Sequence, residues 1–205
     1  MQHMLCSDLE GVFVPEIWIN VAEKTGIDEL RLTTRDISDY NVLMDKRLSI
    51  LDAHGLTLND IQAVIADIDP LPGALEFLDA IRAEHQIIIV SDTFLEFAGP
   101  LMEKLKRPTL FCNCLQVADT GRITGYELRQ ENGKKKTTRA LQDLNYRVIA
   151  FGDSYNDISM LQTADHAFLF RPPENVVQEF PQIAVAYEYD ELAVLIRQAV
   201  SSCHY

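Results

Sequence analysis

The chain has 205 residues, of which 47% are hydrophobic and 24% charged, a composition typical of one globular domain or of a core with a smaller insertion. Its formal net charge of −13 repels phosphate backbones and anionic lipid, so we expect no nucleic-acid partner and no membrane partner. No apolar stretch approaches the roughly 18 residues that span a bilayer. The first residues lack the pattern of a secretory signal, so we expect a cytoplasmic protein. The four cysteines lack the spacing of a disulfide framework or a zinc site, so we expect inert thiols.

The first predicted strand is a short apolar run, residues 4–6, that leads into Asp8. About fifty residues with helical patterns follow, which is too long for a crossover between two strands and too helical for a loop. We therefore predict an inserted helical cap subdomain, residues 14–69, placed over the end of the first strand. The segments 1–13 and 70–205 would form the core domain.

Three helices are predicted in the cap segment, each with its own boundary residues. Residues 15–26 begin with a proline, which suits a first helical turn, and end with a glycine, which suits a helix stop. Residues 41–54 carry apolar side chains at helical spacing, and Gly55 closes the turn. Thr57 has the character of an N-cap residue, with Asp60 three positions on, and predicts the start of the third helix.

After a hinge rich in proline and glycine at 69–73, helices and strands alternate to the end of the chain. Strands are predicted at 86–91, 108–111, 147–151 and 166–170, helices at 73–84, 94–106, 135–144, 156–163 and 190–201, and a hairpin with flanks 114–117 and 122–127. This alternation predicts an α/β, Rossmann-like parallel sheet with helices on both faces. Ligands of such sheets bind at the carboxyl ends of the strands.

Three apolar runs of this predicted sheet end in acids or a hydroxyl group. These side chains are Asp8 and Glu10 after the first run, Ser91 and Asp92 after the second, and Asp153 and Asp157 after the third. The four carboxylates of the first and third runs would repel one another at close range unless a cation lay among them, and oxygen ligands suit Mg²⁺. Each acid alone has a simpler interpretation, Asp153 as a helix cap and Asp8 in a turn. For the whole set we predict a Mg²⁺ site made by Asp8, Glu10, Asp153 and Asp157.

A phosphate site is predicted beside this metal site. Ser91 and the backbone N–H groups after it, at a helix start, can hold a phosphate oxygen, although Ser91 alone is also a plain N-cap. Lys134, Lys135 and Lys136 form a cationic run before a helix. One of these lysines, turned inward, would offset a phosphate and a carboxylate, while the other two stay on a solvated face.

These residues together resemble the haloacid dehalogenase superfamily of aspartyl-phosphate phosphohydrolases. Its four motifs occur in order as residues 8–12, Ser91 after its apolar run, a lysine near 134 and residues 152–157. The segments DLEGVFVPEIW, VLMDKRLSIL, SDTF and GDSYND resemble phosphoserine phosphatases more narrowly. They are most similar to the bifunctional group that also moves phosphate from phosphoserine to homoserine.

The resemblance implies a role for each candidate residue. Asp8 would be the nucleophile, and Glu10 the proton donor and later the base. Mg²⁺ would be held by Asp8, the Glu10 carbonyl and Asp153, and by Asp157 through water. The substrate would be bound through its ammonium group by Glu16, through its carboxylate by Arg47, and through its phosphate by Ser91, the backbone of Asp92, Lys134 and Asn156. Glu16 and Arg47 also have simpler interpretations, as a helix-dipole complement and a snorkelling surface arginine.

Two positions depart from the wider superfamily. Most of its phosphatases have aspartate where this chain has Glu10, so the acid lies one methylene further out. Phosphoserine phosphatases usually have glycine where this chain has Asp92. A carboxylate there would repel bound phosphate unless it pointed away and left only its N–H for the ligand. The bifunctional group shows both departures, so they strengthen the resemblance to that group.

The resemblance therefore implies a Mg²⁺-dependent phosphoserine phosphatase that also transfers the phosphoryl group to homoserine, through an aspartyl phosphate on Asp8. The nearest alternative is a phosphatase of the same superfamily with another small phosphomonoester substrate. A second alternative, a non-enzymatic, receiver-like phosphoacceptor, would gain nothing from a cap or from Glu10. A third, a dehalogenase, has no use for Asp153 and Asp157 as a metal site. The predicted partners are the small molecules phosphoserine and homoserine, and a homodimer is left open.

Overall fold

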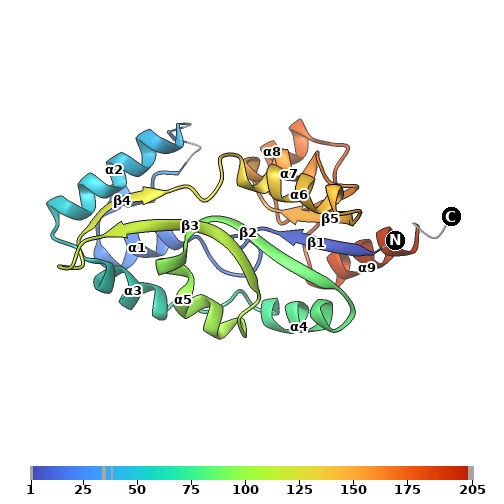
Figure 1. The fold of residues 1–205 in the computed structure, drawn as a ribbon, viewed down its shortest axis with the longest axis horizontal. Helices are drawn as coiled ribbons and strands as arrows, with labels where there is room; N and C mark the ends of the chain where they lie inside the picture. The colour runs from blue at the N-terminus through green and yellow to red at the C-terminus, as the bar shows by residue number, and fades with distance from the viewer. Residues whose placement is uncertain (1, 34–35, 38, 203–205) are drawn as a thin grey trace.

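The computed structural model describes residues 2–33, 36–37 and 39–202, and within them seven strands form one sheet in the order β4-β3-β2-β1-β5-β6-β7 (Figure 1). The strands are β1 His3–Ser7, β2 Gln86–Phe94, β3 Thr109–Val117, β4 Ile123–Glu127, β5 Arg147–Gly152, β6 His166–Phe170 and β7 Ala184–Ala186. All neighbouring strands are parallel except β3 and β4, which form an antiparallel hairpin. The predicted α/β parallel sheet is confirmed.

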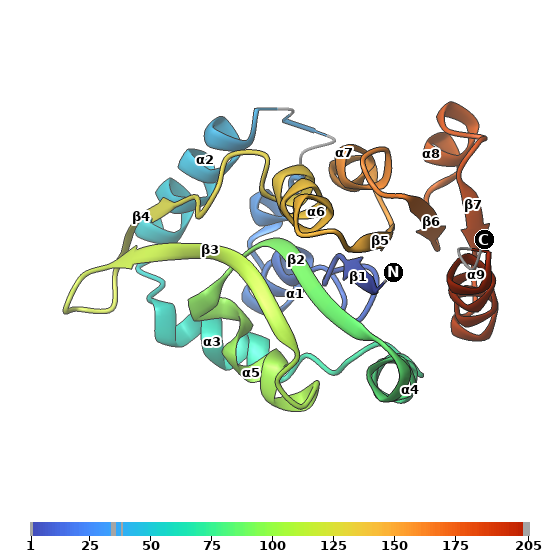
Figure 2. The same cartoon turned by 45° about the vertical axis from the view of Figure 1, so that its right-hand side comes forward.

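Helices cover both faces of this sheet because its central strands are apolar on both sides. Alternate residues of β1, β2 and β5 belong to two separate hydrophobic clusters, as Ile87 and Ile88 do. Figure 2 shows α6 and α7 on one side of the strands and α4 and α5 on the other. The helices are α1 Ile17–Thr25, α2 Tyr40–Ala53, α3 Leu58–Ala66, α4 Ala74–Glu84, α5 Leu95–Lys104, α6 Gly133–Asp143, α7 Ile158–Leu161, α8 Glu174–Glu179 and α9 Tyr189–Ser201, with 3₁₀ turns at Asp28–Arg31 and Tyr155–Asp157.

Several predicted boundaries differ from the structure. Helix α1 begins two residues after Pro15, because Glu16, with a ψ of 116°, has a non-helical backbone and occupies the N-cap position. Strand β2 continues through Ser91 to Phe94, and the runs predicted at 108–111 and 114–117 are one strand, β3. The predicted stop at Gly26 and the capping box at Thr57 are confirmed, since Gly26 has a left-handed backbone and the side chains of Thr57 and Asp60 cap α3 reciprocally.

Helices α1 to α3 lie between β1 and α4 in the chain, and α2 and α3 contact the β3–β4 hairpin. The backbone N–H of Leu71 donates to the Phe13 carbonyl, so the chain leaves and re-enters the core at adjacent points. The Tyr126 hydroxyl of β4 donates to Asn41 Oδ1 of α2 over 2.6 Å, and Leu58 N–H donates to the Gly121 carbonyl over 2.8 Å. Figures 1 and 2 both place β4 beside α2. The sequence did not predict this contact.

None of the helices in the described part of the chain has the length and apolar character needed to cross a membrane.

Candidate active site

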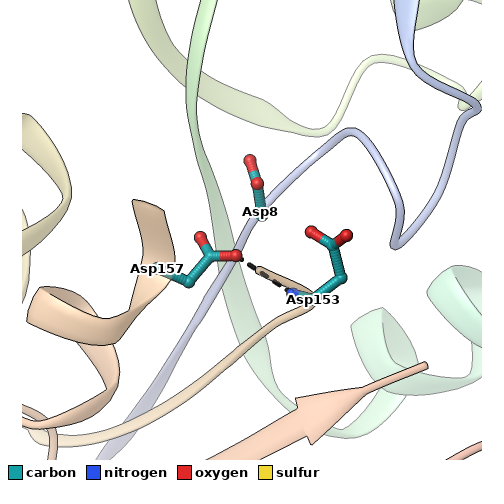
Figure 3. Close-up of side chains that lie close together, drawn as sticks. All are labelled: Asp8, Asp153 and Asp157. Carbon is teal, nitrogen blue, oxygen red and sulfur yellow. Dashed lines mark hydrogen bonds between the residues drawn. The ribbon is translucent and has the colours of Figure 1, made fainter. Parts of the chain in front are cut away.

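Three aspartates come together at the carboxyl end of the sheet (Figure 3). Asp8 follows β1, and Asp153 and Asp157 follow β5, the strand that pairs with β1. One carboxylate oxygen from each lies within 4.8 Å of the others, and all three residues are buried. The order of β1 and β5 in the sheet therefore creates a compact set of oxygen ligands, with acids of the first and last motifs side by side.

Two glycines leave room for these carboxylates. Gly11 has a φ of +74°, and an added Cβ would lie 2.5 Å from the Asp153 carboxylate. A Cβ on Gly152 would collide with the side chain of Asp157. Asp157 Oδ2 accepts hydrogen bonds from the backbone N–H groups of Asp153 and Ser154, over 3.0 and 3.2 Å, and this fixes the turn after β5.

Lys134 is the lysine of the cationic run that turns inward. It is 4% exposed, whereas Lys135 and Lys136 lie on the surface of α6. Its Nζ lies 2.8 Å from Asp8 and 2.7 Å from Asp157. Burial lowers the pKa of Lys134, but the carboxylates of Asp157 and Asp8 outweigh burial and hold this pKa well above its usual value. Lys134 therefore keeps its positive charge.

One lysine does not balance the acids around it. Burial and the charge of Asp157 raise the pKa of Asp8 well above its usual range, although Lys134 opposes this shift. Burial, followed by the charges of Asp157 and Glu16, raises the pKa of Asp153 to about 7. In both groups burial is the larger cause, and repulsion by the neighbouring carboxylates adds to it. A compact, buried set of oxygen donors fits Mg²⁺, which binds through a few carboxylates and keeps several waters.

A cavity of about 340 Å³ opens beside these acids, and its walls include Glu10, Glu16 and Arg47. Glu10 Oε2 accepts a hydrogen bond over 2.8 Å from the backbone N–H of Ile17, in the first turn of α1. Burial, followed by the neighbouring charge of Glu16, raises the pKa of Glu10 to about 8. This shift favours the protonated form of Glu10 at neutral pH.

Arg47 forms part of the same cavity wall and is 7% exposed, so it is not a surface arginine. Its guanidinium lies 4.5 Å from the centre of the Trp18 ring, and Nη2 donates to the Leu32 carbonyl over 2.8 Å. Its buried Nε has no hydrogen-bond partner among the described residues. Burial lowers the pKa of Arg47 to about 10, so it stays charged at neutral pH. A charged guanidinium group in a cavity wall is suited to an anionic ligand.

Ser91 is buried and lines a small hollow between Asp8, Asp153 and Asn156. Its Oγ accepts a hydrogen bond from Thr93 N–H, still within β2. The simpler interpretation of Ser91 as the N-cap of the next helix is wrong, because α5 begins only at Leu95.

The carboxylate of Asp92 does not point away from the site. Its Oδ2 accepts a hydrogen bond from Asn156 Nδ2 over 3.2 Å and lies 3.7 Å from Lys134 Nζ. Asn156 is held by this contact and by the Ser154 hydroxyl, which donates to its Oδ1 over 2.6 Å. The Asp92 side chain therefore faces two of the groups that were expected to surround a phosphate.

The predicted candidate residues thus converge on one region. The small hollow is lined by Asp8, Glu10, Glu16, Ser91, Asp92, Asp153 and Asn156, while Lys134 and Asp157 lie against Asp8 and Arg47 faces the adjoining cavity. Sequence reasoning missed Trp18, which supports Arg47, and Tyr40, whose hydroxyl donates to the Asp92 carbonyl over 3.2 Å. Trp18 is the only tryptophan of the chain and lies two residues after Glu16, which could have drawn attention to it.

A profile of the haloacid dehalogenase-like hydrolases matches residues 24–162. The chain belongs to this family. This haloacid dehalogenase-like hydrolase is 57% identical over 187 residues to "Phosphoserine phosphatase ThrH" of Pseudomonas aeruginosa, which covers 91% of each chain. It is 56% identical over 187 residues to "Phosphoserine phosphatase" of Pseudomonas syringae pv. tomato, covering 91% of this chain and 79% of the relative. The predicted family is confirmed.

Solved structures show the same fold. An apo phosphoserine phosphatase has a TM-score of 0.73 at 23% identity and covers 90% of this hydrolase and 94% of its own chain. A phospho-aspartyl intermediate analogue of phosphoserine phosphatase has a TM-score of 0.75 at 23% identity, covering 94% and 97%. These identities are low, so the likeness concerns the fold.

Proposed function

We propose that this hydrolase is a Mg²⁺-dependent phosphoserine phosphatase that also transfers the phosphoryl group to homoserine. The observation that carries the proposal is the buried set of Asp8, Asp153 and Asp157, paired with Lys134 and open to a cavity with charged walls. The names of two relatives that are 56–57% identical support phosphoserine as the substrate. The phosphotransferase activity rests on the sequence resemblance.

In the proposed first step, a carboxylate oxygen of Asp8 attacks phosphorus while the bond from phosphorus to the serine oxygen breaks. Glu10 gives its proton to that oxygen, and its raised pKa of about 8 keeps the proton available at neutral pH. In the second step, Glu10 takes a proton from water or from the homoserine hydroxyl, whose oxygen then attacks the aspartyl phosphate. The products are inorganic phosphate or phosphohomoserine, and Asp8 is regenerated.

Mg²⁺, held by Asp8, the Glu10 carbonyl and Asp153, would supply positive charge to the phosphate oxygens. Both oxygens of Asp157 already accept hydrogen bonds, one from Lys134 and the other from backbone N–H groups, so Asp157 would reach the ion through water. Lys134 and Ser91 would stabilise the charge that spreads over the phosphate in the transition state.

Selection of the amino-acid part of the substrate is proposed to come from the cavity walls. Arg47 offers its guanidinium group to a carboxylate, and Glu16 offers a negative charge to an ammonium group. A phosphomonoester that lacks these two groups would offer Arg47 no carboxylate to bind. We also propose a cytoplasmic location, which fits the free thiols of Cys6, Cys112 and Cys114.

The proposal is tested with the purified protein, Mg²⁺ and phosphoserine, with and without homoserine, while free phosphate and phosphohomoserine are both followed. We expect phosphate in both reactions, phosphohomoserine only with homoserine, and neither product with EDTA. Sugar phosphates and nucleotides serve as comparison substrates. A clear preference for one of them would favour another phosphomonoester, and a stable phosphoprotein without turnover would favour a phosphoacceptor. Sedimentation of the same sample tests whether the chain forms a homodimer.

A further inference from the structure

The side chain of Asp92 occupies a position that the proposed function gives to the substrate phosphate. One of its oxygens, Oδ2, lies 3.2 Å from Asn156 Nδ2 and 3.7 Å from Lys134 Nζ. Both partners are groups that would otherwise bind phosphate oxygens. A carboxylate and a phosphate oxygen are both anionic hydrogen-bond acceptors, so each can satisfy the same two donors.

Asp92 is the most exposed carboxylate among the described partners of Lys134. Its side chain is 48% exposed, whereas those of Asp8 and Asp157 are 5% and 0% exposed. The Asp92 backbone is fixed, because its carbonyl accepts hydrogen bonds from Asn113 Nδ2 and from the Tyr40 hydroxyl. A change at this position is therefore confined to the side-chain torsions.

Space for that rotation exists on both sides. Asp92 and Asn156 line the cavity of about 340 Å³ and also a neighbouring cavity of about 320 Å³. The second cavity includes Lys134 and the first residues of α6 in its wall. The pair formed by Asp92 and Asn156 thus lies where two open volumes meet, and the carboxylate can leave the site without displacing the core.

We propose that the Asp92 carboxylate is a built-in competitor of phosphate, which holds Lys134 and Asn156 in the free enzyme and returns to them as inorganic phosphate leaves. The proposal rests on the proposed function, since it assumes that these two residues bind phosphate. Bound phosphate must displace the carboxylate and then faces a like charge nearby. This weakens ground-state binding of substrate and product alike, and it speeds product release.

The test is calorimetric binding of inorganic phosphate to the Mg²⁺-loaded protein, a measurement that needs no turnover. Asp92→Asn keeps the shape and an acceptor oxygen but removes the charge, and like-charge repulsion at a half-exposed site predicts phosphate binding about tenfold tighter. The matched control, Asp119→Asn, removes an exposed charge from the hairpin turn, and its phosphate affinity should equal that of the wild type. In kinetics, Asp92→Asn should lower KM for phosphoserine without raising kcat.

Equal or weaker phosphate binding by a folded Asp92→Asn variant would overturn the proposal, because Asp92 would then merely hold its neighbours in place. If that variant does not fold, a crystal structure of the wild type with Mg²⁺ and phosphate decides. We expect the carboxylate to have left Asn156, and a retained hydrogen bond beside bound phosphate would reject the idea. Tighter phosphate binding without phosphoserine turnover would instead reject only the proposed substrate.

Discussion

Replacing Lys134 by methionine tests the charge balance of the site. The side chains have similar lengths, so Lys134→Met removes the charge and leaves most of the packing. The lysine is 4% exposed, and its ammonium group lies 2.8 Å from Asp8 and 2.7 Å from Asp157. Without it, these two buried carboxylates would face each other with no cation among the described side chains nearby.

The expected loss in the free energy of unfolding follows from burial of both partners. Breaking a buried ion pair from one side costs about 3–5 kcal/mol, because an uncompensated charge remains. For a chain of this size each kcal/mol lowers Tm by about 2–4 °C, so the variant should unfold roughly 6–20 °C below the wild type. The carboxyl groups of Asp8 and Asp153 have raised pKa values, about 7 for Asp153, and can take up a proton at lower pH. Their contribution to stability is present at low pH and is lost as pH rises. The difference in Tm between the wild type and Lys134→Met should therefore widen from pH 5 to 8.

The assay is thermal unfolding followed by circular dichroism in EDTA, repeated with Mg²⁺. Added Mg²⁺ should restore more stability to Lys134→Met than to the wild type, because it replaces the missing charge. Lys135→Met is the matched control, since Lys135 is exposed on the next position of α6 and should change stability by less than about 0.5 kcal/mol. If Lys134→Met melts within about 2 °C of this control in EDTA, the buried ion pairs do not stabilise the site as argued.

Three further predictions address the chemistry, the substrate and the metal. The value of kcat/KM should fall as pH rises through about 8, because Glu10 loses the proton that the serine oxygen needs. Glu10→Gln should lack this alkaline decline and react about 10²–10⁴-fold more slowly. An unchanged decline in the variant would assign the titration to another group. Arg47→Lys should raise KM for phosphoserine about 10–100-fold, since lysine lacks the forked donors, but should leave KM for phosphoethanolamine, which has no carboxylate, unchanged; equal effects on both would exclude carboxylate recognition. Gly11→Ala should abolish the Mg²⁺-induced rise in Tm, because its Cβ would meet the Asp153 carboxylate; Gly99→Ala, with open space around the added carbon, should keep the rise, and a full response of Gly11→Ala would contradict the assignment.

The sequence was sufficient to predict the central sheet and the acids at its edge. Strands that are buried on both faces appear in a sequence as continuous apolar runs. The runs before Asp8, Ser91 and Asp153 therefore predict the strands, and their ends predict where a ligand binds. The short elements α8 and β7 escaped prediction, since six and three residues carry too little periodicity.

Side-chain directions were harder to predict. Lys134 was not distinguished from its two neighbours, although Thr138 and Leu141 lie on the same helical face and are buried with it. Arg47 similarly shares the buried face of α2 with Met44 and Leu51, a spacing visible in the sequence. The direction of Asp92 depends on Asn156 and Lys134, which come from distant segments, so no local pattern could have indicated it.

The position of β1 between β2 and β5 has a consequence for how the molecule assembles. Leu5 pairs with both Ile87 and Ile149, so β1 can complete its pairing only after β2 and the more distant β5 have been synthesised. Pairings between distant segments are slow to form. A nascent chain that still lacks β5 would expose the unpaired, apolar edge of β1. Early truncation should therefore yield aggregates instead of a smaller working enzyme.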